Sequence, residues 1–315
     1  MLDKVAICVP TYNNRYSEVL NYINKLTSLC DVFIVFSNND DKLKEYDSYD
    51  WNDKINKVYC DAKTIGEKRK FLVNYLYNKG YQYIIQMDDD VRTFASEINE
   101  STKRTTSESY AKHKITLETL ITRLIDKMIQ YDAAFISPSF PFSLGFSKPG
   151  AIAINKSLNF GQFTVVDVLK LKANNIEYDT RDNIHEDIDL VIQILQHGMT
   201  CVTLKDTAFE VTGSSSLFEN STVCQASKLD YARVNLYLKY RDGISLRIGK
   251  RGELRLTCKL DKYWNTFEIP VKNDLYHNKM YELCQKYDIE GIKELIRNKN
   301  KSSYNYERKK KHFNW

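Results

Sequence analysis

Short apolar runs alternate with amphipathic stretches along the first two thirds of the chain. Four of the early runs have the composition of strands buried on both faces: Val5–Pro10, Val32–Ser37, Lys57–Cys60 and Tyr81–Met87. Two stretches between them, Tyr16–Leu29 and Thr64–Asn78, are predicted to be helices. In the second helix the expected apolar stripe consists of Ile65, Phe71, Leu72 and Leu76.

The alternation continues to about residue 212. The expected elements are a helix at Leu117–Tyr131, a strand at Ala134–Ser137, a strand-to-helix element at Val165–Ala173, a helix at Asn183–His197 and a strand at Val202–Leu204. The polar residues 95–115 and the aromatic-rich residues 138–150 are predicted to be loops. Strand–helix alternation at this spacing predicts an α/β fold, a mostly parallel sheet flanked by helices.

A different pattern begins after about residue 225 and predicts an α+β appendage. Helices are expected at Tyr231–Tyr240 and, as a pair, within Tyr276–Asn298, and a hairpin joins Ile244–Ile248 to Leu254–Leu260. The alternate hairpin positions form one polar, basic face: Ser245, Arg247, Arg255, Thr257 and Lys259. The chain is therefore divided into a catalytic domain, 1–220, and a basic region, 221–315.

Charge supports this division. The net charge of +5 combines 21 Lys and Arg against 11 Asp and Glu after residue 220 with 25 against 30 before it. An acidic body and a basic end suggest different partners. The seven scattered cysteines form no CxxC, which fits buried thiols in a reducing compartment. No apolar run is long enough to span a bilayer and no signal peptide is expected, so the location predicted is cytoplasmic.

Three consecutive carboxylates, Asp88, Asp89 and Asp90, follow an apolar strand. Burying an unpaired carboxylate is costly, so a cation is expected beside them. Mg²⁺ and Mn²⁺ are usually held by one or two carboxylates together with phosphate oxygens and water. Because alternate residues point the same way, Asp88 and Asp90 are predicted to face one ion while Asp89 faces elsewhere. The alternative is a solvated turn.

Two further acids, Glu186 and Asp187, stand at the start of the helix predicted at Asn183–His197. Acids are favoured at this position by the helix dipole and by the free backbone N–H groups, and this is the simpler interpretation. The functional interpretation is a carboxylate poised as the general base for a hydroxyl.

Two other segments carry weaker signals. One lies at the end of the first strand and consists of Pro10, Thr11, Tyr12 and Asn13. It offers an aromatic ring and polar groups to a nucleotide base, and the alternative is a plain turn. The helix start 64–70 contains Gly66, Lys68 and Arg69, which could meet a diphosphate or form a solvated basic face. Walker, GxSxG and GxGxxG motifs are absent, which argues against serine hydrolysis and hydride transfer.

The order of these motifs resembles that of the GT-A glycosyltransferases over residues 4–212. The resemblance rests on Pro10-Thr11-Tyr12-Asn13, Gly66-x-x-Arg69, Asp88-x-Asp90 and Glu186-Asp187. It implies metal-dependent sugar transfer from a nucleoside-diphosphate sugar such as a UDP-sugar. At the position after the second strand where that family often has an acid, this chain has Asn38, with Asp40 two residues on.

The resemblance also implies a role for each matching residue. Asp88 and Asp90 would bind Mn²⁺ or Mg²⁺ at the diphosphate, and Asp187 would be the base, with Glu186 as the alternative. A further set would hold the nucleotide sugar: Pro10, Thr11, Tyr12, Asn13, Asn38, Gly66, Arg69, Asp88 and Asp89. A histidine that often completes the metal site has no clear counterpart, His277 being the only late candidate before the tail.

The basic C-terminal region bears on the acceptor. Its candidate nucleic-acid contacts are Arg247, Arg255, Lys259, Trp264, Arg308, Lys309 and Lys310. In size and basic appendage the chain looks like phage-type enzymes that glycosylate hydroxymethylated pyrimidines in DNA, which would place it in a host cytoplasm. The expected acceptor is then double-stranded DNA containing 5-hydroxymethylcytosine, with a flipped base received by the loop Phe140–Phe146. Two alternatives stay open: a glycan or lipid-linked acceptor, and a non-catalytic nucleic-acid-binding protein on a transferase fold.

Overall fold

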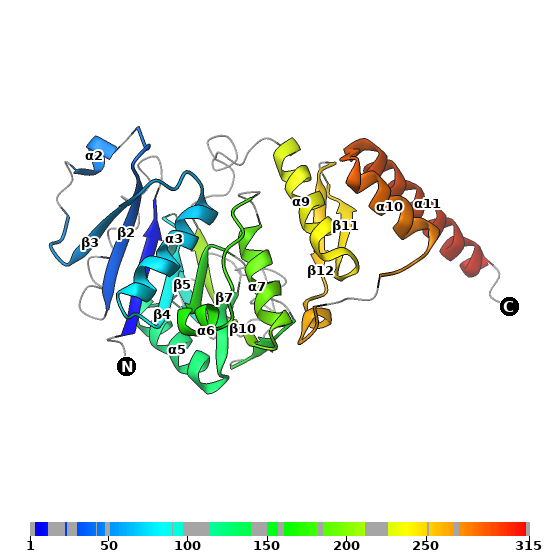
Figure 1. Cartoon of the computed structure of the whole chain (residues 1–315). Helices are drawn as coiled ribbons and strands as arrows, with labels where there is room; N and C mark the ends of the chain where they lie inside the picture. The colour runs from blue at the N-terminus through cyan, green and yellow to red at the C-terminus, as the bar shows by residue number, and fades with distance from the viewer. Residues whose placement is uncertain are drawn as a thin grey trace. The chain divides into compact units, whose positions relative to one another are not determined.

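The structure is a computed structural model. It describes residues 4–11, 23, 30–41, 43–47, 51–89, 91–96, 114–139, 150–156, 161–181, 185–211, 226–250, 252–267 and 271–312. The chain divides into two compact units, Met1–Ser214 and Ser215–Trp315, which are coloured blue to green and yellow to red in Figure 1.

The first unit is built on a ten-stranded sheet in the order β3-β2-β1-β4-β9-β7-β10-β5-β6, with β8 paired to β10. The strands are β1 (Val5–Pro10), β2 (Asp31–Ser37), β3 (Ile55–Cys60), β4 (Tyr83–Met87), β5 (Val91–Ser96), β6 (Lys114–Ile115), β7 (Ala133–Ser139), β8 (Ile152–Ile154), β9 (Phe163–Asp167) and β10 (Thr200–Val211). All residues of β1 are buried, as are those of β7 and β9, which agrees with strands covered on both faces.

The sheet is parallel in one half and mixed in the other. Strands β3, β2, β1 and β4 run parallel, as the strand–helix alternation predicts. Strand β9 is antiparallel to β4 and β7, and β5 is antiparallel to β10. Although β5 follows β4 closely in the sequence, it does not pair with β4 and lies on the far side of β10.

Three expectations from the sequence need correction. The loop expected at 95–115 begins and ends in strands β5 and β6, and residues 97–113 lie outside the described part. The strand expected at Val202–Leu204 is the twelve-residue β10, because its polar residues Asp206 and Thr207 are buried at an irregular register with β7. The basic tail after Glu307 continues a helix up to His312.

Five described helices belong to the first unit: α2 (Leu43–Asp47), α3 (Ile65–Asn78), α5 (Leu117–Gln130), α6 (Val168–Ala173) and α7 (Glu186–Gln196). Helix α3 begins where it does because Thr64 and Glu67 form a reciprocal capping box. Of the helix expected at Tyr16–Leu29, only Ile23 is described, and it is helical.

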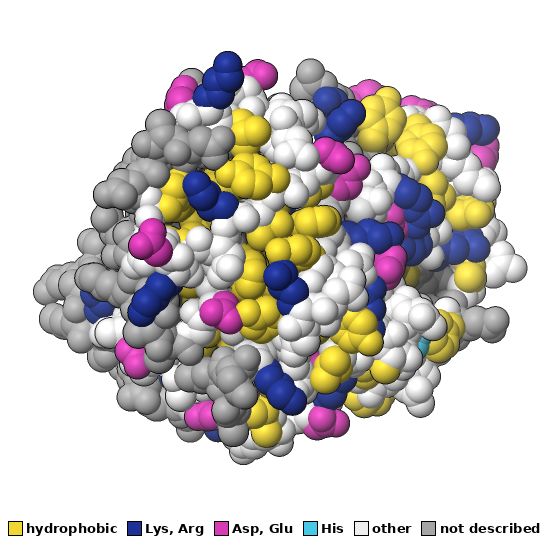
Figure 2. Space-filling view, turned by 60° about the vertical axis from the view of Figure 1, so that its left-hand side comes forward, with side chains coloured by type: hydrophobic (Ala, Val, Ile, Leu, Met, Phe, Trp, Pro, Cys, Tyr) yellow, Lys and Arg dark blue, Asp and Glu magenta, His cyan; other side chains and the backbone are white. Residues whose placement is uncertain are grey.

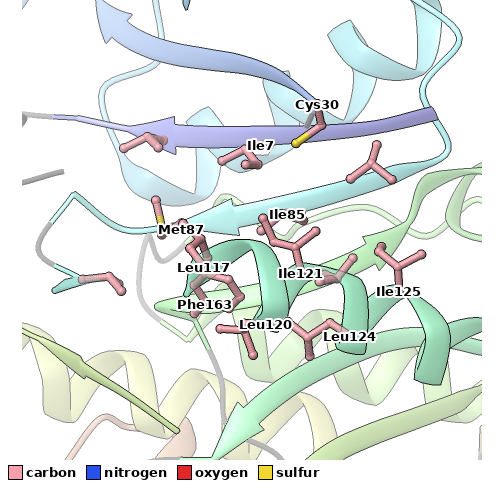
Figure 3. Packing of buried hydrophobic residues seen from close by; sticks show 14 of the residues in the cluster. Ile7, Cys30, Ile85, Met87, Leu117, Leu120, Ile121, Leu124, Ile125 and Phe163 are labelled. Atoms are coloured by element: carbon pink, nitrogen blue, oxygen red, sulfur yellow. The ribbon is translucent and has the colours of Figure 1, made fainter. Parts of the chain in front are cut away.

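Helices cover both faces of the sheet and fix its edge. The apolar face of α5 packs on the sheet and contacts β7, and Figure 3 shows Leu117 and Ile121 beside Met87 and Ile85 of β4. On the opposite face Phe33 of β2 meets Tyr75 of α3, ring to edge, at 6.2 Å between centroids. Each fully buried aliphatic side chain contributes about 1.5–3 kcal/mol, so this core holds the strand ends firmly.

The buried face of α3 differs from the predicted stripe. Leu72 and Leu76 are buried as expected, but Ile65 and Phe71 are only half-buried. Lys68 and Arg69 are buried instead, each 3% exposed. The solvated basic face considered for this helix start is therefore wrong, and two cations lie inside the first unit.

The second unit consists of α9 (Ala226–Tyr240), the short helix η3 (Arg241–Gly243), the hairpin β11 (Ile244–Ile248) and β12 (Leu254–Cys258), the short helix η4 (Leu260–Tyr263), α10 (Leu275–Gln285) and α11 (Ile289–His312). The hairpin is confirmed. Asp230 of α9 accepts a hydrogen bond from the backbone N–H of Leu254 and pairs with Lys293 and Arg233. This single buried carboxylate joins α9, β12 and α11.

Exposed hydrophobic and charged side chains are interspersed on the face drawn in Figure 2, where yellow patches lie between basic and acidic side chains. Among the described residues, no helix has the length and apolar character needed to cross a membrane. The six described cysteines are all free thiols, five of them buried.

Candidate active site at the carboxyl edge of the sheet

Three parallel strands of the first unit end at the same edge of the sheet. Thr11 follows β1, Asn38 follows β2 and Asp88 follows β4. In open α/β sheets, ligands bind outside the carboxyl ends of the strands. The first turns of α3 and α7 also come together here, because Gly66 of α3 lies against Glu186 of α7.

The first two acids of the triplet contact different partners. Asp88 Oδ1 accepts a hydrogen bond from Arg69 Nη2 at 3.0 Å, and the Asp88 side chain is 26% exposed. Asp89 is buried, and its Oδ2 accepts a hydrogen bond from Thr11 Oγ1 at 2.9 Å. Asp88 is thus joined to the arginine of α3, whereas Asp89 is joined to the end of β1.

Arg69 links the two acidic motifs. Its Nη1 donates to Glu186 Oε1 at 2.6 Å, and its Nη2 donates to Asp88 Oδ1 and to the carbonyl oxygen of Gly161, the latter at 2.6 Å. Burial lowers the pKa of Arg69, but Asp88 and Glu186 outweigh it and the net shift is upward. The guanidinium is therefore a fixed positive charge between motifs that lie almost a hundred residues apart in the chain.

Glu186 lies in an environment that disfavours its charge. It is 6% exposed. Burial raises the pKa of Glu186 to about 7, since the attraction of Arg69 only partly offsets it and Asp187 adds repulsion. A carboxyl that is both buried and bound to Arg69 is badly placed to accept a proton from a substrate hydroxyl.

Asp187 is more accessible than Glu186 and is held at one oxygen. It is half-buried, and its Oδ1 accepts the backbone N–H of Ile188 at 2.7 Å. Its Oδ2 lies against Gly161, where a β-carbon would come within 2.7 Å of it. Gly161 has φ +94°, a conformation that favours glycine, so both the backbone and the carboxylate require a glycine there.

Lys68 lies at the end of β1 on this edge. Its Nζ donates to the carbonyl oxygen of Thr11 at 2.7 Å. Burial lowers the pKa of Lys68, against the attraction of Cys60, Asp40 and Asp89. Asp40 is 7% exposed. Since Asn38 is exposed and donates to Asp61, Asp40 rather than Asn38 is the polar group beyond β2 that lies near Lys68.

A divalent ion fits this edge only with help from a substrate. Among the described residues there is no cluster of three or more His, Cys, Asp or Glu side chains arranged for a metal. Asp88 offers a partly exposed carboxylate whose Oδ1 is already bound to Arg69. One hard oxygen ligand of this kind, together with Asp90 and diphosphate oxygens, matches the usual coordination of Mg²⁺ in nucleotide enzymes.

Some predicted residues fall elsewhere. The structure does not describe several of them: Tyr12, Asn13, Asp90 and the loop Phe140–Phe146. His277 belongs to the second unit, where its Nδ1 lies 2.7 Å from Asp274 Oδ2. Gly161 was missed, because a single glycine before a strand carries no distinctive signal.

The hairpin of the second unit presents the basic face that alternation predicts. Ser245, Arg247, Arg255, Thr257 and Lys259 are all exposed. Ser245 is paired with Thr257 and Arg247 with Arg255. Directly opposed like charges destabilise a strand pair, and Glu253 forms an ion pair with Arg255. Trp264 is 42% exposed, while the side chains of Arg308, Lys309 and Lys310 on α11 lie outside the described part.

Residues 6–215 match a protein family described as TAGT, TET-associated glycosyltransferase. No curated protein matches the sequence. Among solved structures, residues 1–349 of S. aureus TarS are similar, with a TM-score of 0.51, 12% identity and coverage of 95% of this chain and 92% of that chain. The same TarS fragment is known in complex with UDP-GlcNAc.

A second similar structure is the mannosyltransferase PcManGT from Pyrobaculum calidifontis in complex with GDP-Man and Mn²⁺. Its TM-score is 0.50 and its identity 14%, and the match covers 76% of this chain and 65% of that chain. At such identities the similarity concerns the fold. The GT-A fold predicted from the order of the motifs is confirmed.

Proposed function

The chain belongs to the TET-associated glycosyltransferase family, and we propose that it transfers a sugar from a UDP-sugar to a hydroxymethylated pyrimidine in double-stranded DNA. It is a nucleotide-sugar glycosyltransferase of the GT-A type. The observation that carries the proposal is the convergence of Asp88 and the Glu186-Asp187 pair on Arg69 at one edge of the sheet.

Asp187 is the proposed general base. Its accessibility and its position beside Gly161 favour it over Glu186, whose carboxyl is buried on Arg69. The backbone N–H of Ile188 holds one carboxylate oxygen, which leaves the other to accept a proton. A base held in this way contributes about 10²–10⁴-fold to the rate.

The reaction is a single displacement at the anomeric carbon. The acceptor hydroxyl oxygen forms the new bond to that carbon as its proton passes to Asp187. The bond from the anomeric carbon to the diphosphate oxygen breaks, and its electron pair leaves on UDP. One direct displacement inverts the anomeric configuration.

The donor is proposed to lie along Thr11, Lys68, Asp88 and Asp89, with Pro10, Tyr12, Asn13, Gly66 and Asn38 as the further proposed contacts. A divalent ion, Mn²⁺ or Mg²⁺, is proposed at Asp88 and Asp90 on the diphosphate. It would stabilise the charge that develops on the leaving phosphate. The Mn²⁺ in the PcManGT complex supports this choice of ion.

DNA is proposed as the acceptor because the second unit carries an exposed basic face. Arg247 and Arg255 are opposed across the hairpin, and the ion pair of Arg255 with Glu253 offsets only part of this positive charge. Lys259 extends this face, and Trp264 adds an exposed aromatic ring. A face with three exposed basic side chains favours a polyanion such as a phosphate backbone over a neutral glycan.

The acceptor is tested by incubating the protein with several nucleotide sugars and DNA that contains 5-hydroxymethylcytosine, followed by mass spectrometry of the released nucleosides. The expected product is a glycosylated 5-hydroxymethyl-2′-deoxycytidine that forms only with modified DNA. Turnover of the donor without a nucleoside product would refute DNA as acceptor and favour a glycan. Absence of both donor binding and turnover would refute the transferase assignment of the site.

The metal proposal has a separate test in Asp88→Ala. Hydrolysis of the UDP-sugar by the native chain is expected to require added Mn²⁺ or Mg²⁺ and to be lost in the variant. Unchanged turnover in the variant, or full activity after chelation, would contradict a metal at Asp88.

A further inference from the structure

Arg69 is a buried cation at the active-site edge, and its guanidinium contacts both acidic motifs. Its side chain is 4% exposed and lies between two carboxylates and a carbonyl oxygen. A buried charge is tolerated only when it is paired and hydrogen-bonded. Both terminal nitrogens are used in this way, and Nε has no hydrogen-bond partner among the described residues.

This arrangement differs from that of a side chain that binds a diphosphate. A phosphate ligand has to present free N–H groups toward the open side of the site. The terminal nitrogens of Arg69 are instead directed at Glu186, Asp88 and the carbonyl oxygen of Gly161. The contacts of Arg69 connect four parts of the fold: α3, the turn after β4, the segment that leads into β9, and α7.

The beginning of α7 depends on this contact. Its N-cap residue, His185, has a left-handed backbone with φ 66° and makes no side-chain cap hydrogen bond. A helix start without such a cap loses one of its usual anchors. Glu186, the first helical residue, is anchored by Arg69 and packs on Gly66, where a β-carbon would meet Glu186 Cγ at 3.3 Å.

Resting on the proposed role of Asp187, we propose that Arg69 is a positioning residue for sugar transfer. Its guanidinium fixes Glu186, and through Glu186 it fixes the first turn of α7 that carries Asp187. The contacts with Asp88 and Gly161 hold the same guanidinium against the donor turn. The distance between the base and the donor is therefore set by one buried side chain.

If Arg69 only positions the base, its loss should lower kcat without weakening the binding of the donor nucleotide. In Arg69→Met, kcat for hydrolysis of the best UDP-sugar is expected to fall at least thirtyfold, about 2 kcal/mol in activation free energy. The Kd for UDP, measured by calorimetry, is expected to stay within threefold of the native value. A rise of the UDP Kd beyond threefold would make Arg69 a donor ligand and overturn the proposal, as would an unchanged kcat.

Lys70→Met is the matched control. Lys70 lies next to Arg69 on α3 and also makes an ion pair, with Glu177 at 2.6 Å, but both of these side chains are about 40% exposed. Both kcat and the UDP Kd are expected to match the native protein. A comparable loss of kcat in the control would show that any ion pair from α3 matters, which contradicts a specific role for Arg69.

The double variant Arg69→Met Glu186→Met tests whether Arg69 acts through Glu186. It also shows whether a loss of activity in Arg69→Met comes from destabilisation of the fold. Removing only Arg69 leaves Glu186 buried without its partner, whereas removing both exchanges a buried ion pair for apolar contacts, which is often tolerated. The double variant is expected to unfold at a higher temperature than Arg69→Met and to have the same kcat. A further large drop in kcat would mean that Glu186 acts independently, which overturns the proposal.

Donor hydrolysis and UDP binding do not involve DNA, so these outcomes are independent of the acceptor. If the native chain hydrolyses a UDP-sugar but modifies no DNA, the acceptor is wrong and the role of Arg69 is still tested. If Asp187→Asn retains native hydrolysis while Arg69→Met loses it, the proposed base is wrong instead.

Discussion

The two units of the chain use their charges in opposite ways. In the first unit the charged side chains at one edge of the sheet are buried and hydrogen-bonded: Lys68, Arg69, Asp89 and Glu186. In the second unit Arg247, Arg255 and Lys259 are exposed along one face of a hairpin, although Asp230 beneath them is buried. Buried charges fix geometry because they cannot move without losing a partner, whereas exposed charges attract a partner without fixing its position.

The family match follows the same division. It ends at residue 215, one residue beyond the first unit. The buried charges therefore belong to the part that has the family's sequence pattern, and the exposed charges belong to a part outside it. Substitutions at the buried charges of the first unit are expected to change the rate of sugar transfer strongly. Substitutions at the exposed charges of the second unit are expected to change DNA binding in small steps.

The largest effect is expected from Asp187→Asn. An amide accepts no proton at neutral pH, so transfer is expected to fall by about 10²–10⁴-fold while UDP binding is retained. Initial rates and calorimetry measure the two quantities. Asp126→Asn, at an exposed position on α5, is the control. Native transfer by Asp187→Asn would move the base to another residue.

Glu186 provides a test through pH. Its pKa is raised from 4.5 to about 7 in the folded chain, so the folded state favours the protonated form. The associated stability is complete below pH 4.5 and is lost as the pH rises to about 7, a change of about 3 kcal/mol. Glu186→Gln does not titrate, so its free energy of unfolding relative to native should improve by about that amount between pH 4.5 and 8.

Urea unfolding of both proteins at several pH values measures this difference. If the glutamine variant instead became relatively less stable at high pH, the attraction of Arg69 would outweigh burial. The ionised carboxylate of Glu186 would then stabilise the folded chain through Arg69, and burial of this charge would carry no net cost.

Gly161→Ala separates backbone strain from a clash in the site. A β-carbon there meets Asp187 Oδ2 at 2.7 Å, whereas at Gly80, which has a similar φ of +89°, it meets nothing within 4 Å. Both alanine variants should lose about 1–2 kcal/mol of stability from left-handed backbone strain. Only Gly161→Ala should also lose transfer, by about tenfold. Equal activity of the two in initial-rate assays would contradict the contact with Asp187.

The smallest effects are expected on the hairpin. Arg247→Ala and Arg255→Ala should each leave the free energy of unfolding within about 0.5 kcal/mol and should reduce the salt dependence of DNA binding. Each lost phosphate contact lowers the slope of log K against log salt by about 0.9. Fluorescence anisotropy at several salt concentrations measures the slope. Lys57→Ala, at an exposed position on β3, should leave it unchanged, and equal slopes in all variants would contradict a DNA-binding hairpin.

The sequence predicted those elements whose signals are local. Buried strands such as Val5–Pro10 and the exposed alternation of the hairpin were readable because each depends on a short period of apolar and polar residues. The GT-A fold was predictable because four motifs occur in a fixed order. Strand β5 was missed because it follows the acidic triplet without a helix between them, and its pairing partner, β10, lies more than a hundred residues later.

Most residues of the site could be predicted from the sequence, but the contacts between them could not. Arg69 and Glu186 were each recognised, but the bond between them connects residues that lie 117 positions apart. For Lys68 and Arg69 both a diphosphate contact and a solvated face stayed open, because no local pattern distinguishes a buried basic side chain from a solvated one. Gly161 acquires its meaning only when Asp187 lies against it.

Strand β10 has a consequence for the order in which the first unit can be made. It is the last strand of this unit in the sequence but lies inside the sheet, with its first half paired to β7 and its second half to β5. During synthesis, β7 and β5 must therefore wait for residues 200–211 before their edges are closed. Open strand edges are sites of intermolecular pairing, and such long-range pairing forms slowly. A nascent chain interrupted before Thr200 would leave both edges open to aggregation.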